Sequence, residues 1–293
     1  MAGIKELRLR IASVGNIKQI TRAMEMVATT KLRRFQDRAT ASRPYSQEIS
    51  GLVGRLAAML GEGVADRPLF AHRKPSKSLA LVVSSDRGLC GAYNTSLFRE
   101  LEQWRRKRGQ PVEYFVYGRK AHAYMGKRDF EIKGYLTDPA LEAIDYRNAA
   151  ICARMLTQHF LEGDYSDVWV LYTAFESMSR YVPTWVQFLP IEAAALQPAS
   201  PDRGAEPGGD VLLEPDAETV FDLLVPRYLE TRIYNALLES LTSEYASRRF
   251  AMKNATDAAT DMQGELRGIY NRLRQETITK ELLDIVGGAE AVS

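Results

Sequence analysis

Proline is missing from both ends of this chain of 293 residues. All twelve prolines lie between Pro44 and Pro226, so residues 1–43 and 227–293 contain none. A proline inside a helix removes a backbone hydrogen bond and costs about 3 kcal/mol. Both ends are therefore free to form long, uninterrupted helices. We predict two terminal helices that pair with each other and hold a globular insert between them.

Long apolar runs, cysteines and histidines are also scarce. No run of 18 apolar residues exists, so the sequence predicts no helical membrane span. The start has no apolar signal region, so secretion is not expected. Cys90 and Cys152 lack the CxxC spacing, which favours a reducing compartment without disulfide or zinc chemistry. The three histidines are scattered and suggest neither a catalytic triad nor a metal site.

No group of residues predicts a catalytic centre. The loop 84–91 (SSDRGLCG) is the candidate for an active site, because it lies between a predicted strand and a predicted helix. Glycine loops at that position can hold phosphates, but this loop matches neither GxGxxG nor GxxxxGK[ST]. Its glycines are more often required by backbone geometry. We expect a chain without a catalytic, cofactor or metal site.

The predicted terminal helices show the apolar spacing of a coiled-coil seam. The step from Val14 to Ile17 is three residues where the heptad needs four, which predicts a local overwinding of the coil. The predicted seam consists of Ile4, Leu7, Ile11, Val14, Ile17, Ile20, Met24 and Val27 in the first helix, and of Ala255, Ala259, Met262, Leu266, Ile269 and Leu273 in the last.

Positive charge is concentrated at the start of the chain. Residues 1–43 hold ten Lys and Arg against three acidic residues, whereas the whole chain has a net charge of +2. A solvated coiled-coil face, an acidic protein partner and nucleic acid would each explain this basic helix. Nucleic acid is the weakest of the three, because only Phe35 is aromatic in this segment.

The middle of the chain alternates strand-like and helical segments, which predicts a small α/β domain with a mostly parallel sheet. The last two strands are close enough in sequence for an antiparallel hairpin around residues 177–180. The predicted strands are 79–83, 112–117, 168–175 and 182–189, and the predicted helices are 93–108, 119–125 and 146–162.

These patterns give four predicted parts. A coiled-coil helix covers residues 1–60, with an irregularity at Pro44. An α/β domain covers 76–195, and a polar linker rich in Pro and Gly covers 196–214. A second coiled-coil helix covers 215–288 and is expected to stop at the glycine pair 287–288.

Five segments, in order along the whole chain, resemble one known family, the gamma subunit of F-type ATP synthases. Residues 20–28 (ITRAMEMVA) and 31–34 (KLRR) resemble its N-terminal helix. Residues 85–91 (SDRGLCG) resemble its Rossmann-like domain, and 251–257 (AMKNATD) resemble its return helix. Residues 278–291 (ITKELLDIVGGAEA) resemble its C-terminal signature.

The resemblance implies a central rotor shaft that has no catalytic site and binds no nucleotide itself. The implied fold is a long antiparallel coiled coil of the N- and C-terminal helices with an inserted Rossmann-like α/β domain. The implied partners are the alpha and beta subunits in a 3:3 hexamer, the epsilon subunit and the membrane c-ring of Fo. The implied place is peripheral, on the cytoplasmic face of a bacterial inner membrane.

The resemblance also implies contacts between the shaft and its surrounding hexamer. Basic residues near Arg33 would face acidic loops of the beta subunits. Residue by residue, the implied contacts fall on Arg22, Met24, Lys31, Arg33, Arg34, Arg248, Gln275, Thr279 and Glu281.

Two other classes of protein stay open at this stage. One is a nucleotide-binding α/β enzyme whose helical ends serve oligomerisation, although a phosphate-loop motif is missing. The other is a coiled-coil tether, or a basic rod that binds nucleic acid. Co-purification with ATPase-like chains would separate the shaft from both.

Overall fold

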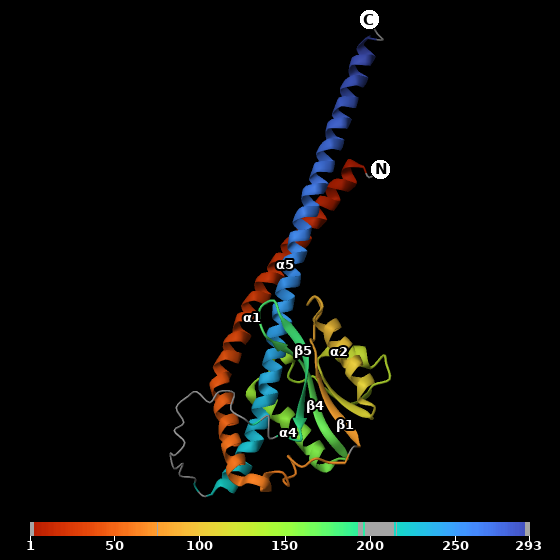
Figure 1. Cartoon of the computed structure of the whole chain (residues 1–293). Helices are drawn as coiled ribbons and strands as arrows, with labels where there is room; N and C mark the ends of the chain where they lie inside the picture. The colour runs from red at the N-terminus through yellow and green to blue at the C-terminus, as the bar shows by residue number, and fades with distance from the viewer. Residues whose placement is uncertain (1–2, 75, 193–195, 197–213, 215, 291–293) are drawn as a thin grey trace. The chain divides into compact units, whose positions relative to one another are not determined.

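The computed structural model describes residues 3–74, 76–192, 196, 214 and 216–290. Two very long helices begin and end the chain, and an α/β segment lies between them in sequence (Figure 1). The elements are α1 (Ile4–Leu60), β1 (Lys77–Val83), α2 (Tyr93–Arg108), β2 (Val112–Tyr117), α3 (Arg119–Met125), β3 (Glu131–Leu136), α4 (Tyr146–Glu162), β4 (Tyr165–Phe175), β5 (Tyr181–Leu189) and α5 (Ala217–Glu290), with short 3₁₀ turns at Gly61–Val64 and Leu141–Ala143.

Contacts divide the chain into two compact units. We call the first the coil unit, which combines Met1–Thr30 with Arg248–Ser293. We call the second the sheet unit, which is Lys31–Ser247. The four predicted parts follow the sequence rather than these contacts, and their boundaries stay a prediction. Residues 197–213 of the predicted linker lie outside the described residues.

In the coil unit, α1 and α5 pack side by side in opposite directions (Figure 1). The hydroxyl of Thr256 donates to the hydroxyl of Thr21 at 2.8 Å. A Cβ added to Gly15 would lie 2.9 Å from the Gln263 amide nitrogen. Residue numbers therefore fall along one helix as they rise along the other, and the predicted antiparallel pairing is confirmed.

The seam of this pair differs from the predicted one after Val14. On α1, Lys18, Thr21 and Glu25 are partly buried and Ala28 is buried, which continues an unbroken heptad from Ile4. The predicted overwinding is therefore wrong. Small or polar residues fill this part of the seam, so hydrophobic spacing alone does not reveal it. Predicted seam residues that are instead exposed are Ile17, Ile20, Val27, Met262 and Ile269.

Neither the prolines nor the glycine pair inside the long helices ends them, and the irregularity expected at Pro44 stays a prediction. α1 continues through Pro44 to Leu60, and α5 contains Pro226 near its start. α5 also continues through the glycine pair 287–288 to Glu290, so the predicted stop is wrong. A glycine costs a helix about 1 kcal/mol relative to alanine, which a long helix tolerates.

In the sheet unit, five strands have the order β3-β2-β1-β4-β5. All neighbours pair in parallel except β4 and β5, which form the predicted antiparallel hairpin. The sheet is covered on both faces, since Leu79 and Ala80, whose side chains point to opposite faces, are both fully buried. α2 and α3 cover one face, where Leu97 and Met125 join the core formed with β1 and β2.

Candidate functional site

The point where ligands usually bind in such a sheet is occupied by α5. From β1 the chain adds β2 and then β3 on one side of the sheet. It then returns to add β4 on the other side of β1, so the direction of the connections reverses between β1 and β4. Open α/β sheets bind ligands at the carboxyl ends of the strands beside such a reversal. Here Ser247 on α5 donates to the Cys90 carbonyl at 2.6 Å. Ser243 donates to the Thr173 carbonyl at 3.0 Å.

The loop 84–91 is held together by its own neighbours. The Ser84 hydroxyl accepts a hydrogen bond from the Ala121 amide at 2.8 Å. The Asp86 carboxylate accepts one from the Arg119 amide at 3.0 Å, at the start of α3. The Asn94 side chain binds the Ser85 hydroxyl at 2.7 Å. These bonds fix a turn between β1 and α2 and join it to α3, which favours the backbone interpretation of this loop.

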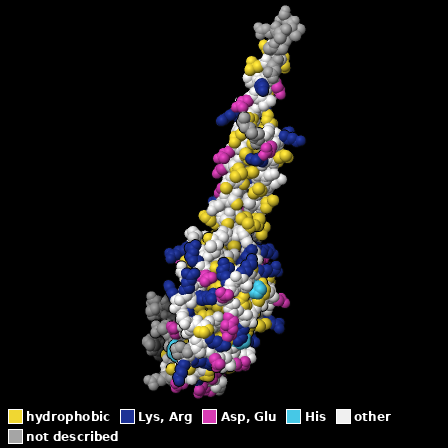
Figure 2. All heavy atoms as spheres, turned by 90° about the vertical axis from the view of Figure 1, so that its right-hand side faces the viewer, with side chains coloured by type: hydrophobic (Ala, Val, Ile, Leu, Met, Phe, Trp, Pro, Cys, Tyr) yellow, Lys and Arg dark blue, Asp and Glu magenta, His cyan; other side chains and the backbone are white. Residues whose placement is uncertain are grey.

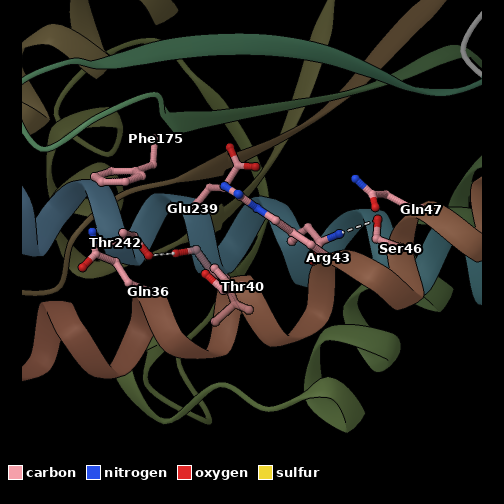
Figure 3. Close-up of a pocket in the computed structure, with 11 residues that line it drawn as sticks. Gln36, Thr40, Arg43, Ser46, Gln47, Phe175, Glu239 and Thr242 are labelled. Carbon is pink, nitrogen blue, oxygen red and sulfur yellow. Dashed lines mark hydrogen bonds between the residues drawn. The ribbon is translucent and has the colours of Figure 1, made fainter. Parts of the chain in front are cut away.

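A cavity of about 460 Å³ lies between α1 and α5 in the sheet unit. Arg43 extends from α1 and Glu239 from α5, with the Phe175 ring nearby (Figure 3). Burial raises the pKa of the Glu239 carboxyl, and the positive charge of Arg43 opposes that rise. Six of the other lining side chains are amides or hydroxyls: Gln36, Thr40, Ser46, Gln47, Asn235 and Thr242. This is a polar groove between two helices.

Other chemically active side chains serve packing. The His122 ring stacks on Tyr135 at 4.1 Å between centroids. Both cysteines are buried, and burial raises the pKa of the Cys152 thiol to about 12. Among the residues that the structure describes, no cluster of His, Cys, Asp or Glu could hold a metal ion. Within the same residues, no helix is both long and apolar enough to span a membrane.

Most residues implied as hexamer contacts are exposed. Arg22, Arg33 and Arg34 are exposed on α1, and Met24 is partly buried. On α5, Arg248 is only 7 % exposed. The three implied contacts nearest the end of α5 are all exposed: Gln275, Thr279 and Glu281.

Lys31 is already engaged within the sheet unit. Its ammonium group lies 2.6 Å from the Glu142 carboxylate and 5.5 Å from the centre of the Tyr245 ring. An outside partner would have to compete with these contacts. Lys31 therefore differs from Arg33 and Arg34, for which the exposed positions leave the guanidinium groups accessible.

The coil unit also exposes large apolar side chains that are not among the implied contact residues. Ile17 and Ile20 on α1 are 52 % and 59 % exposed, and Met262 on α5 is 53 % exposed. Figure 2 shows yellow hydrophobic side chains along the surface of this helix pair. Their spacing predicts that they pack between the two helices, whereas in the structure they face outward.

The end of α5 extends past the start of α1 within the coil unit (Figure 1). Counting about 17 residues along each helix from the Thr21–Thr256 pair places Ile4 opposite Leu273. Residues 274–283, 285 and 286 are all exposed. We call residues 278–286 the tip. Its exposed apolar side chains are Ile278, Leu282, Leu283, Ile285 and Val286.

Known proteins similar to this chain along its whole length are ATP synthase gamma chains. The family model described as ATP synthase matches residues 3–292. The ATP synthase gamma chain of Mycolicibacterium paratuberculosis is 41 % identical, and the alignment covers 100 % of this chain and 98 % of that protein. The gamma chain of Moorella thermoacetica is 39 % identical with both chains fully covered. A chain in the central stalk and c-ring structure of the Tetrahymena thermophila mitochondrial ATP synthase is 25 % identical, with a TM-score of 0.60 over 80 % of this chain and 99 % of that one.

Proposed function

Because the chain belongs to the ATP synthase gamma chain family, we propose that it is the central rotor shaft of an F-type ATP synthase. It is a non-catalytic subunit that couples ion flow through the membrane c-ring to ATP synthesis or hydrolysis at the alpha and beta subunits. The observation that carries this proposal is the antiparallel pairing of the two ends of the chain, fixed by Thr21 and Thr256.

The mechanics of the helices suit this role. A shaft must resist twisting, and α1 and α5 run for 57 and 74 residues. It must also move past its housing without being trapped. Exposed ion pairs contribute only about 0–1 kcal/mol each, so contacts at Arg22, Arg33 or Arg34 can break and form again at each step.

The proposed partners follow from the two units. The coil unit lies inside the hexamer of alternating alpha and beta subunits, and the α/β domain contacts the epsilon subunit and the c-ring. This chain lies peripherally on the cytoplasmic face of a bacterial inner membrane. The exposed arginines of α1 support this assignment, because they offer positive charge to acidic loops of the beta subunits.

We propose the same contact residues that the resemblance implies, but give Lys31 a smaller part in binding the hexamer. Arg33 and Arg34 are the main basic contacts, whereas Lys31 supports the position of α1 through Glu142. Near the end of α5, Gln275 precedes the tip, and Thr279 and Glu281 present polar groups among its apolar side chains. Met24 stays an uncharged contact that lets α1 pass the acidic loops.

A nucleotide-binding enzyme is the competing proposal, and the position of α5 counts against it. Ser243 and Ser247 bind the carboxyl-end carbonyls of Thr173 and Cys90. A nucleotide at the reversal point would need that space.

Affinity purification of the tagged full chain from its native membranes tests the proposal. We expect two ATPase-like chains in a 3:3:1 ratio with this one, and ATPase activity in the complex but not in the isolated chain. Purification of the chain alone, together with nucleotide binding by it, would favour the enzyme instead.

A further inference from the structure

Three serines of α5 form one row against the carboxyl ends of β1 and β4. Ser240, Ser243 and Ser247 are spaced by three and four residues, which places them on one face of the helix. Their residues are 0 %, 0 % and 2 % exposed. We call them the serine row.

Each serine binds a group that belongs to the inserted α/β segment. The hydroxyls of Ser240 and Tyr93 lie 2.7 Å apart, at the start of α2. Ser243 donates to the Thr173 carbonyl in β4, and Ser247 donates to the Cys90 carbonyl in the loop after β1. The row therefore joins α5 to both sides of the reversal point.

Thr173 shows why a donor from α5 is needed there. The Glu176 amide donates to the Arg180 carbonyl at 3.1 Å, so that pair is hydrogen-bonded. Pairs alternate along an antiparallel ladder, so Thr173 and its partner Pro183 form a non-hydrogen-bonded pair, and the Thr173 carbonyl points away from β5. On the other side, the pairing of β1 with β4 ends at Val82 and Leu171. The Thr173 carbonyl therefore points toward the β1 side, two residues beyond the last β1–β4 pair. The Ser243 hydroxyl satisfies a buried carbonyl that would otherwise be costly.

Hydrogen bonds and apolar packing resist different movements. Apolar packing between a helix and a sheet is non-directional, so small sliding or rotation changes it little. Hydrogen bonds weaken steeply when their angles bend. A row of three buried bonds therefore fixes the rotation of α5 about its own axis as well as its position along that axis.

We propose that the serine row is the joint that transmits torque between the inserted α/β domain and α5. This rests on the proposed rotor function, because only a rotating chain loads this joint. The serines act as positioning residues: they hold α5 in the crevice that related sheets use for ligands. In this chain, α5 occupies the crevice where related sheets bind a ligand.

The test uses the assembled ATP synthase in sealed membrane vesicles. ATP hydrolysis is measured together with the ATP-driven membrane potential, which a voltage-sensitive dye reports for any coupling ion. In the variant S240A/S243A/S247A, we expect hydrolysis to stay within about two-fold of the unmodified complex, while the potential generated per ATP falls about three-fold. An unchanged ratio in the assembled variant would overturn the proposal.

Thr242→Val is the matched control. Thr242 is a buried hydroxyl residue on the same helix, but its hydroxyl binds the Leu238 carbonyl of α5 itself at 2.8 Å. The ratio should stay unchanged in this variant. If the triple variant does not assemble, Ser243→Ala should lower the ratio and Ser243→Thr, which keeps the hydroxyl, should restore it; equal ratios in these two would count against the joint.

Hydrogen exchange in the isolated full chain separates this proposal from the rotor function. In the triple variant, amides of residues 90–93 and 173–175 should exchange faster than in the Thr242→Val chain. Faster exchange without any assembly into an ATPase would reject the rotor and its torque while leaving the serine row as a structural contact. Equal exchange in both variants would reject the joint itself.

Discussion

At the scale of single residues, the Glu113 carboxylate is buried among cationic groups from neighbouring strands. It lies at the start of β2, only 8 % exposed. Lys77 from β1 approaches one of its oxygens at 2.6 Å, and Lys133 from β3 approaches the other at 3.2 Å. Tyr165 at the start of β4 also donates a hydrogen bond to it. One carboxylate thus joins four neighbouring strands.

The pKa of Glu113 makes the stability of the sheet unit sensitive to acid. Burial alone would raise this pKa, but hydrogen bonds from Lys77, Tyr165 and Lys133 lower it to about 2 from the ordinary 4.5. A lowered pKa stabilises the fold above pH 4.5, and the contribution disappears as the pH falls toward 2. The full difference is on the order of 3 kcal/mol.

We therefore expect urea unfolding of the full chain, followed by circular dichroism, to show a steeper loss of stability between pH 4.5 and 2.5 than in the Glu113→Gln variant. Glu265→Gln on α5 is the control, because that side chain is exposed and lies outside this group. An acid dependence of Glu113→Gln equal to that of the unmodified chain would contradict the prediction.

At the scale of secondary-structure elements, two glycines with positive φ separate backbone strain from steric conflict. Gly118, between β2 and α3, has a φ of 104°, and an added Cβ would lie 2.2 Å from the Ser84 carbonyl oxygen. Gly109 ends α2 with a φ of 71°, and nothing lies within 4 Å of its added Cβ. Only Gly118 meets both problems.

Gly118→Ala should lower the free energy of unfolding by at least about 3 kcal/mol, whereas Gly109→Ala should cost about 1 kcal/mol. Chemical denaturation of the two full-length variants checks the difference. Similar losses in both would mean that the turn after β2 moves away from Ser84 easily.

The seam of the coil unit gives a second contrast between elements. Leu7 lies in the seam at 4 % exposure, whereas Ile17, predicted for the same seam, is 52 % exposed. Leu7→Ser should lower the stability of the helix pair by about 2–3 kcal/mol, and Ile17→Ser by less than about 0.5 kcal/mol. Thermal unfolding at 222 nm measures both. The reverse order would restore the predicted seam with its overwinding.

Much of the element order could be predicted from the sequence. The predicted bounds of α2, β2, α3 and α4 are confirmed to the residue, because apolar periodicity and flanking Gly or Pro mark their ends. β3 was missed. Its sequence EIKGYL has no buried residue, and Gly134 leaves space for the Phe115 ring of β2. An edge strand covered on one side only lacks the apolar signature of a central strand.

The candidate site was harder to predict for a physical reason. The serine row depends on contacts between residues that are about 70–160 positions apart in sequence, and serine on a helix has no distinctive pattern. The exposed Ile17 and Ile20 show the converse. Their spacing is that of a buried seam, and only the register of the partner helix reveals that they face outward.

At the scale of the whole molecule, the exposed apolar side chains of the tip indicate a surface that a partner covers. Five large apolar residues between 278 and 286 are 47–68 % exposed. Soluble proteins rarely leave such a cluster in water unless a partner covers it. Within the proposed rotor, the hexamer of alpha and beta subunits provides that cover.

The isolated full chain should therefore associate with itself at high concentration, and Leu282→Ser/Ile285→Ser should reduce that association. The thermal midpoint should change little, because both side chains contact mainly water in the single chain. Sedimentation velocity over a range of concentrations measures the association. Leu223→Ser is the control, since Leu223 is 67 % exposed on α5 but lies outside the tip. If this control reduces association equally, exposed apolar area in general, rather than the tip, joins the chains.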